Sequence, residues 1–164
     1  MNLLPISHRR QQQQADCLAA CAAMVLDYLQ VPISYDRLLR LLNIRAHGAA
    51  FANLRNLANL GVAVVVAEGD LEHLQKLLAS GLPPLVAVAT RELGYWTEDT
   101  DHVVVVTGIA GNLVYIHDPD LGAGPVAVTR VQFESAWLEE DYRFAVLTLT
   151  TIGGHAVSDS FQIS

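Results

Sequence analysis

Cysteine is scarce in this sequence of 164 residues, which contains only Cys17 and Cys21. A cysteine pair four residues apart on a helix would close too small a loop to stabilise a fold, so a disulfide framework is excluded. Cys17, Cys21 and His102 together are too few ligands for a metal site, and the sequence has neither a paired Cys-x-x-Cys nor a His-rich motif. We therefore expect no metal and no cofactor.

Basic residues and long apolar runs are also few. Ten Lys and Arg against seventeen Asp and Glu give a net charge of −7, which disfavours nucleic acid and anionic membrane surfaces as partners. The apolar run that starts at Cys17 is broken by Asp27, short of the roughly 20 residues that cross a bilayer. The N-terminus lacks the long apolar centre of a secretory signal. We expect a cytoplasmic protein without membrane insertion.

Apolar residues, in contrast, make up 52% of the chain, which is enough to bury one sizeable core. We predict a single domain over residues 1–164, with its core at about 10–150 and a loose polar tail at 151–164. The composition leaves the oligomeric state open.

The first half of the chain has helical patterns. Strong helix formers follow Asp16 and are apolar on every face, which predicts a buried helix that starts at Cys17 and is capped by the Asp16 carboxylate. Three amphipathic stretches with closing signals follow, at residues 35–42, 51–60 (closed by Gly61) and 71–78 (closed by Ser80 and Gly81).

The second half consists mainly of short β-branched runs separated by turn residues. They predict strands at residues 85–89, 102–109, 113–117, 126–128 and 144–150, with one short helix at 130–138. Helices first and then a mainly antiparallel sheet are typical of an α+β domain.

Cys17 has the most reactive position that a cysteine can take in this pattern. The free N–H groups and the dipole at a helix N-terminus favour its thiolate, although a small buried hydrophobic role is the common alternative. Cys21 lies one turn deeper, and we interpret it as a core residue.

A histidine and an aspartate are expected to meet at one end of a hairpin. His102 begins the most apolar strand, and Asp118 ends the next one, with the turn residues Gly111 and Asn112 between them. Pairing about that turn puts residues 102 and 118 directly opposite each other. The carboxylate could then orient the imidazole as a general base, while an Asp-Pro turn is the structural alternative for Asp118.

These residues resemble the double-glycine leader peptidases, papain-like domains that trim bacteriocin and related precursors. The resemblance covers residues of about 10–150 and rests on Gln11-(four residues)-Asp16-Cys17-x-x-Ala20-Cys21-x-x-Met24, His102-Val-Val-Val-Val-x-Gly108 and Val114-Tyr-Ile-His-Asp118-Pro119-x-x-Gly122. It implies a papain-like fold, a Cys17–His102–Asp118 triad, and Gln11 as the oxyanion-hole donor. The sequence departs from the family at Leu18, where glycine is usual.

The triad predicts a cysteine peptidase that hydrolyses a peptide bond through an acyl-enzyme. The same residues would also serve a papain-fold acyltransferase, and a non-catalytic peptide-binding domain is a third possibility. The expected partner is a peptide or protein substrate, by resemblance one with a Gly-Gly cleavage site. The pair Gly153 and Gly154 could itself be such a site, although a flexible exit from the last strand explains it as well.

Overall fold

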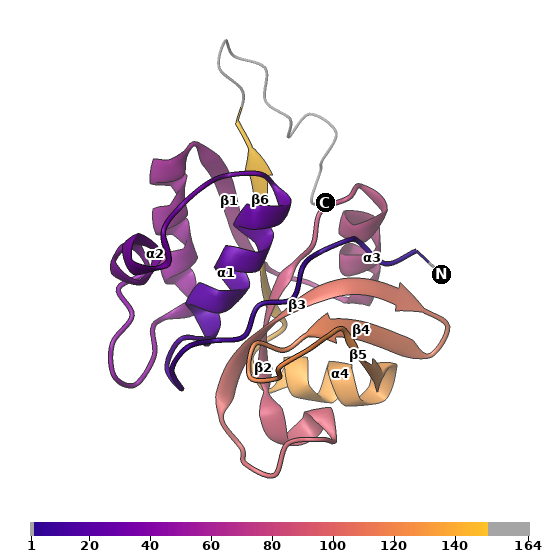
Figure 1. The fold of residues 1–164 in the computed structure, drawn as a ribbon. Helices are drawn as coiled ribbons and strands as arrows, with labels where there is room; N and C mark the ends of the chain where they lie inside the picture. The colour runs from indigo at the N-terminus through magenta and orange to yellow at the C-terminus, as the bar shows by residue number, and fades with distance from the viewer. Residues whose placement is uncertain (1, 151–164) are drawn as a thin grey trace.

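The computed structural model describes residues 2–150 and contains one six-stranded antiparallel sheet with helices on both faces (Figure 1). The strand order is β1-β6-β2-β3-β4-β5. The strands are β1 (Val62–Glu68), β2 (Leu85–Ala89), β3 (Asp101–Ala110), β4 (Leu113–His117), β5 (Val126–Thr129) and β6 (Arg143–Leu149). The helices are α1 (Cys17–Tyr28), α2 (Tyr35–Leu41), α3 (Leu71–Ala79) and α4 (Arg130–Leu138), with 3-10 helices η1 (Phe51–Leu60) and η2 (Thr90–Leu93). The predicted α+β class is confirmed.

The sheet separates two apolar clusters, which explains the unbroken apolar run of β3. Val103 and Val105 pack with α1, α2 and η1 on one face, whereas Val104 and Val106 pack with α3 and α4 on the other. A strand covered on both faces has no polar side, so period-two alternation is absent from its sequence. β3 therefore lies in the middle of the fold, between the two apolar clusters.

Helix α1 is the central helix, and residues 18–26 are buried all around, as predicted. It begins at Cys17, also as predicted, but the cap is different. The Asp16 carboxylate makes no capping bond to the helix; it accepts bonds from Gln13 N at 3.2 Å and from the Tyr35 hydroxyl at 3.3 Å. The expected N-cap role of this carboxylate is wrong, because the residue is turned toward the preceding loop.

Two elements were not predicted. β1 forms an edge strand paired with β6, so the first half is not purely helical, and η2 follows β2 directly. The stretch 51–60 closed by Gly61 is helical as expected, but in the 3-10 form. Among the described residues, no helix is both long and apolar enough to span a membrane.

The hairpin of β3 and β4 forms in a different register from the predicted one. Ala110 faces Leu113 across the two-residue turn, and a bulge between Val106 and Gly108 then brings Val105 opposite His117. Continuing this register puts Asp118 opposite Val104, two residues from the predicted partner His102. The direct pairing is therefore wrong, because neither the two-residue turn nor the bulge was counted.

The single-domain assignment for residues 1–164 stays a prediction. The tail with Gly153 and Gly154 lies outside the described residues.

Candidate active site

An N-terminal strap, residues 2–11, leads the chain to the site. Its Leu4 N–H donates to Thr107 O at 2.9 Å, and its Gln11 N–H donates to Pro119 O at 2.8 Å. The strap is thus bonded to the bulge of β3 at one end and to the loop after β4 at the other. Gln11 is consequently held next to the segment that contains Asp118, six residues before Cys17.

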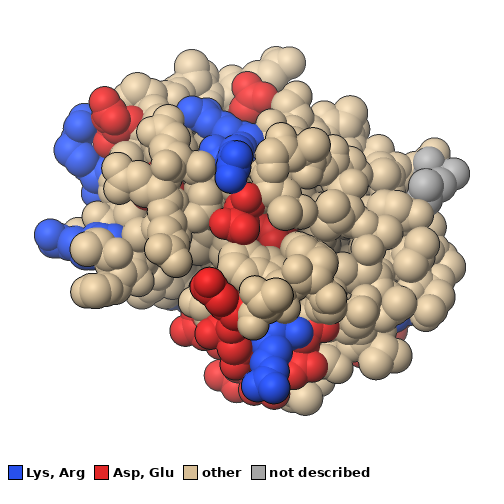
Figure 2. All heavy atoms as spheres, turned by 60° about the horizontal axis from the view of Figure 1, so that its bottom comes forward, with Lys and Arg blue, Asp and Glu red and all other residues tan. Residues whose placement is uncertain are grey.

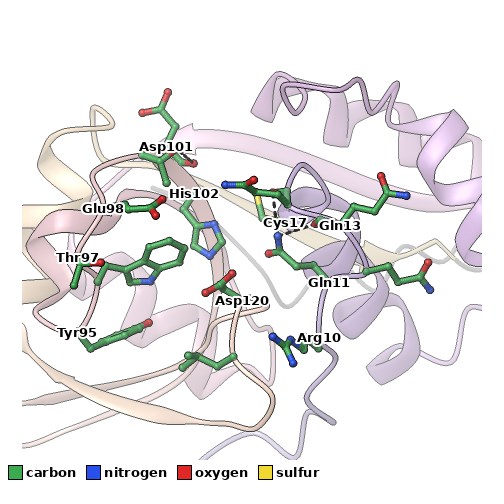
Figure 3. A pocket seen from close by; sticks show the side chains of 15 residues that line it. Arg10, Gln11, Gln13, Cys17, Tyr95, Thr97, Glu98, Asp101, His102 and Asp120 are labelled. Atoms are coloured by element: carbon green, nitrogen blue, oxygen red, sulfur yellow. Dashed lines mark hydrogen bonds between the residues drawn. The ribbon is translucent and has the colours of Figure 1, made fainter.

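Cys17 occupies the first turn of α1 and is partly exposed, unlike the residues that follow it. Two hollows, with volumes of about 740 and about 570 Å³, are both lined by Cys17 and His102. The first also contains residues 10–14 and the loop from Tyr95 to Asp101 (Figure 3), and the second contains residues 46–52 with Ala87. An extended ligand could therefore lie across the cysteine with one part in each hollow.

His102 and Asp118 form a buried ion pair, 2.7 Å from Nε2 to Oδ1, with 5% and 0% of their side chains exposed. Burial lowers the pKa of His102, but its bonds to Asp118 and its interactions with Cys17 outweigh this effect and raise the pKa to about 9. Burial alone would raise the pKa of Asp118, yet His102 and the other donors lower it to about 2. The pair is therefore charged at neutral pH.

Asp118 is held by three further donors that the sequence did not reveal. The Tyr95 hydroxyl at 2.6 Å and Trp96 Nε1 at 2.8 Å both donate to Oδ2, and the Asp120 N–H donates to Oδ1 at 2.9 Å. The Trp96 ring also lies against the His102 ring, 5.0 Å between centroids. Tyr95 and Trp96 thus belong to the site as positioning residues for the carboxylate.

Gly94 explains why the two aromatic residues reach Asp118. It ends η2 in the left-handed region with φ of 89°, and a Cβ at this position would clash with the side chain of Gln132 on α4. A residue with a side chain would be strained there, so glycine allows the turn. The sequence signal that could have identified these site residues is a glycine followed by two aromatic residues in a polar loop. This pattern is too common to indicate a site by itself.

Gln11 lines the first hollow together with Cys17, as its predicted role requires. Its amide nitrogen donates to the carbonyl oxygens of Gln13 at 2.9 Å and Gln14 at 3.0 Å (Figure 3), so both hydrogens are engaged. Its carbonyl oxygen is buried and makes no hydrogen bond within the described residues. In this arrangement Gln11 shapes the loop before α1, and it could bind another acceptor only by exchanging one of these bonds.

The remaining sequence candidates have structural roles. Cys21 is fully buried, donates from Sγ to Val103 O at 3.2 Å, and burial raises the pKa of its thiol. Leu18 is a buried residue of α1 that belongs to the core and also borders the second hollow. Within residues 2–150, no cluster of three or more His, Cys, Asp or Glu side chains could hold a metal ion.

Acidic side chains are prominent around the hollows. Glu98, Asp101 and Asp120 line the first hollow beside Arg10, while Glu140 borders the second. Burial and the charge of Asp101 raise the pKa of Glu140 to about 7. On the face shown in Figure 2, acidic groups gather near the centre and along the lower part, next to basic groups, and most of the surface is uncharged.

The comparison with known families gives one match over most of the chain. The profile described as the Peptidase C39 family matches residues 6–141. The colicin V secretion/processing ATP-binding protein CvaB of Escherichia coli is 29% identical over 120 residues, or 73% of this chain. The chain spans only 15% and 18% of the length of the curated relatives that it matches.

Solved structures share the fold at low sequence identity. A C39-like peptidase from Bacillus anthracis superposes with a TM-score of 0.76 at 17% identity, covering 93% of this chain and 100% of that one. A double glycine motif protease from an AMS/PCAT transporter, solved with its leader peptide, gives 0.70 at 20% identity, covering 89% and 93%. The arrangement of helices and sheet described above is therefore that of C39-like peptidase domains.

Proposed function

The chain belongs to the peptidase C39 family and is a cysteine peptidase, and from this premise we propose that Cys17, His102 and Asp118 are its catalytic residues. The observation that carries the proposal is the position of Cys17 and His102, which border both hollows while Asp118 holds the far nitrogen of the imidazole. Asp118 can thus orient the imidazole that borders the same hollows as the thiol, as a nucleophile, base and orienting group require.

The thiolate of Cys17 attacks the carbonyl carbon of the scissile bond. His102 uses Nε2 for Asp118, which leaves Nδ1 for the reaction; as an imidazolium it gives its Nδ1 proton to the leaving amine when the C–N bond breaks. The acyl-enzyme is then cleaved by water, whose proton returns to Nδ1 while the thiolate leaves. Asp118 keeps its negative charge throughout and stabilises the imidazolium.

The tetrahedral oxygen requires donors near Cys17. The Cys17 N–H belongs to the first turn of α1, where backbone N–H groups have no partner within the helix. We assign the second donor to the Gln11 amide, which lines the same hollow. This role requires the amide to release the Gln13 or Gln14 carbonyl and turn one N–H to the oxyanion as substrate enters.

The substrate we propose is a leader peptide cleaved after Gly-Gly. The curated relative is described as a secretion/processing protein, and one structural neighbour holds a leader peptide. The second hollow is bordered by small residues, among them Gly48, Ala49 and Ala50, which allow a peptide backbone to approach closely.

A cytoplasmic location also stays a prediction.

A mass-spectrometric assay tests this function. The protein is incubated with leader peptides that contain Gly-Gly and with matched peptides in which both glycines are replaced by Val, with and without an added amine. Cleavage of only the Gly-Gly peptides, lost in Cys17→Ala and kept in Cys21→Ala, is the expected result. Amine adducts as the main products would instead indicate acyl transfer. Binding without any product, in fresh protein with a reactive thiol, would contradict catalysis.

A further inference from the structure

Two histidines outside the triad contact each other next to Asp118. His8 lies in the N-terminal strap, and His117 is the last residue of β4. Their Nδ1 atoms are 3.0 Å apart, and the ring centroids are 4.9 Å apart at an angle of 50°. His117 is buried, with 2% of its surface exposed, whereas His8 is partly exposed. The reaction described above uses neither ring.

The outer nitrogens of both rings face backbone carbonyls. His8 Nε2 is 2.6 Å from Leu121 O, and His117 Nε2 is 2.8 Å from Ile6 O. A carbonyl oxygen can only accept, so each Nε2 must carry a hydrogen. In a neutral imidazole the other nitrogen then has none. Two neutral rings would consequently place two lone pairs against each other at 3.0 Å, which is a repulsive contact.

One additional proton resolves this conflict. If one ring is an imidazolium, its Nδ1–H donates to the Nδ1 of its neighbour, and all four ring nitrogens are satisfied. A second proton would remove the acceptor and restore the repulsion. We propose that His8 and His117 hold one shared proton as a positioning pair that joins the strap carrying Gln11 to the loop carrying Asp118. The expected effect on turnover rests on the proposed function. The existence of the shared proton does not depend on that function.

The surroundings favour His8 as the ring that carries the charge. Burial lowers the pKa of His117, its bond to Ile6 acts against this, and the charge of His8 lowers it further, so the shared proton is favoured on His8. The short contact from His8 to Leu121 O also fits a charge-assisted bond. Gly124 encloses the pair, since a Cβ there would lie 2.5 Å from His117 Nδ1 and 2.9 Å from His8 Nδ1.

Charged neighbours on the same segments have their contacts elsewhere. Arg9 lies over the Tyr35 ring at 4.8 Å, and Arg10 and Asp120 line the first hollow. The carboxylate of Asp118 is bonded to His102, Tyr95 and Trp96, and to the Asp120 N–H. The proton of the pair is therefore held by the second imidazole and the two carbonyls. When it is lost at high pH, the hydrogen bond between His8 Nδ1 and His117 Nδ1 is lost with it.

Nitrogen-15 NMR of the ring nitrogens tests the proton directly and needs no substrate. We expect His8 to carry hydrogens on both nitrogens at about pH 7.5, where a free imidazole is mostly neutral. His117 should carry its hydrogen on Nε2 alone. Two neutral rings at that pH, or two charged rings, would overturn the proposal whatever the enzyme does.

His8→Gln is the matched variant for the positioning role. A glutamine amide can donate one N–H to His117 Nδ1 and the other to Leu121 O without an added proton. The ratio of kcat/KM in wild type to that in His8→Gln should therefore fall with rising pH as the pair deprotonates, by roughly 5-fold, the effect of one ordinary hydrogen bond. His102 contributes equally to both proteins and cancels. If NMR shows the shared proton but the kcat/KM ratio does not change with pH, the positioning role is refuted. If neither protein turns over substrate, the result counts against the proposed function alone.

Discussion

His102 Nε2 lies 2.7 Å from Asp118 Oδ1 inside the protein, and this contact keeps the imidazole charged up to high pH. Burial by itself would lower the pKa of His102. The interactions with Asp118 and Cys17 are stronger than this effect and raise the pKa to about 9. The imidazole of His102 is therefore charged over the whole neutral range, as the proposed pairing with a Cys17 thiolate requires.

The first prediction concerns pH. The pKa of His102 is raised from 6.5 to about 9, so its pairing with Asp118 stabilises the fold fully below pH 6.5 and is lost as the pH rises through about 9. We expect kcat/KM to decline above about pH 9. In Asp118→Asn the pKa of His102 should fall, and the decline should move to lower pH. An unchanged upper limit in Asp118→Asn would show that the carboxylate does not set the charge of the imidazole.

The Asp118 carboxylate also accepts hydrogen bonds from Tyr95 and Trp96 on its other oxygen, Oδ2. Tyr95→Phe and Trp96→Phe each remove one donor to Oδ2 and preserve the aromatic ring volume in large part. A hydrogen bond to a charged group contributes about 1.5–3 kcal/mol, so we expect kcat/KM to fall roughly 10-fold or more in each variant. The lower limit of the pH profile should also move to higher pH, because the pKa of Asp118 rises when its carboxylate loses a donor.

Tyr142→Phe is a matched control for these two variants, since Tyr142 packs edge-on against Trp137 and is not among the donors to Asp118. Equal losses in all three variants, with no change in pH profile, would indicate a general loss of stability rather than a role at Asp118.

For Gln11 we predict a loss confined to the transition state. Gln11→Ala should lower the rate of acylation by roughly 100-fold or more, while alkylation of Cys17 by iodoacetamide keeps its pH dependence, since an oxyanion donor acts on the tetrahedral oxygen and not on the resting thiolate. Gln12→Ala and Gln13→Ala serve as controls. If all three variants lose the same activity, the glutamines act only by shaping the loop before α1.

The sequence identified the elements whose signals are local. The apolar run of β3 and the turn residues of the β3–β4 hairpin were enough to bring His102 and Asp118 to one end of a hairpin, and the family resemblance added Cys17 from the first turn of α1. The register was wrong by two residues because the two-residue turn pairs Ala110 with Leu113, a displacement of three residues that the bulge at Thr107 reduces by one. Asp118 still reaches His102, since side chains on neighbouring strand ends can contact diagonally.

The partners of Asp118 could not be predicted in the same way. Tyr95 and Trp96 reach the carboxylate through the left-handed turn at Gly94 and the packing of Gln132, which are tertiary contacts. The contact of His8 with His117 likewise joins residues 109 positions apart. Asp16 was predicted as a helix cap from its position alone. In the structure its carboxylate accepts hydrogen bonds from Gln13 N–H and the Tyr35 hydroxyl instead. Long-range polar contacts of this kind depend on the finished fold.

The most direct test of the account measures the alkylation rate of Cys17 by iodoacetamide as a function of pH, in a Cys21→Ala background so that one thiol reports. We predict fast labelling well below the pH at which a free thiol ionises in wild type, and a profile shifted toward that of a free thiol in His102→Ala, because the thiolate then lacks its imidazolium partner. Identical profiles in the two proteins would contradict the catalytic pair of Cys17 and His102.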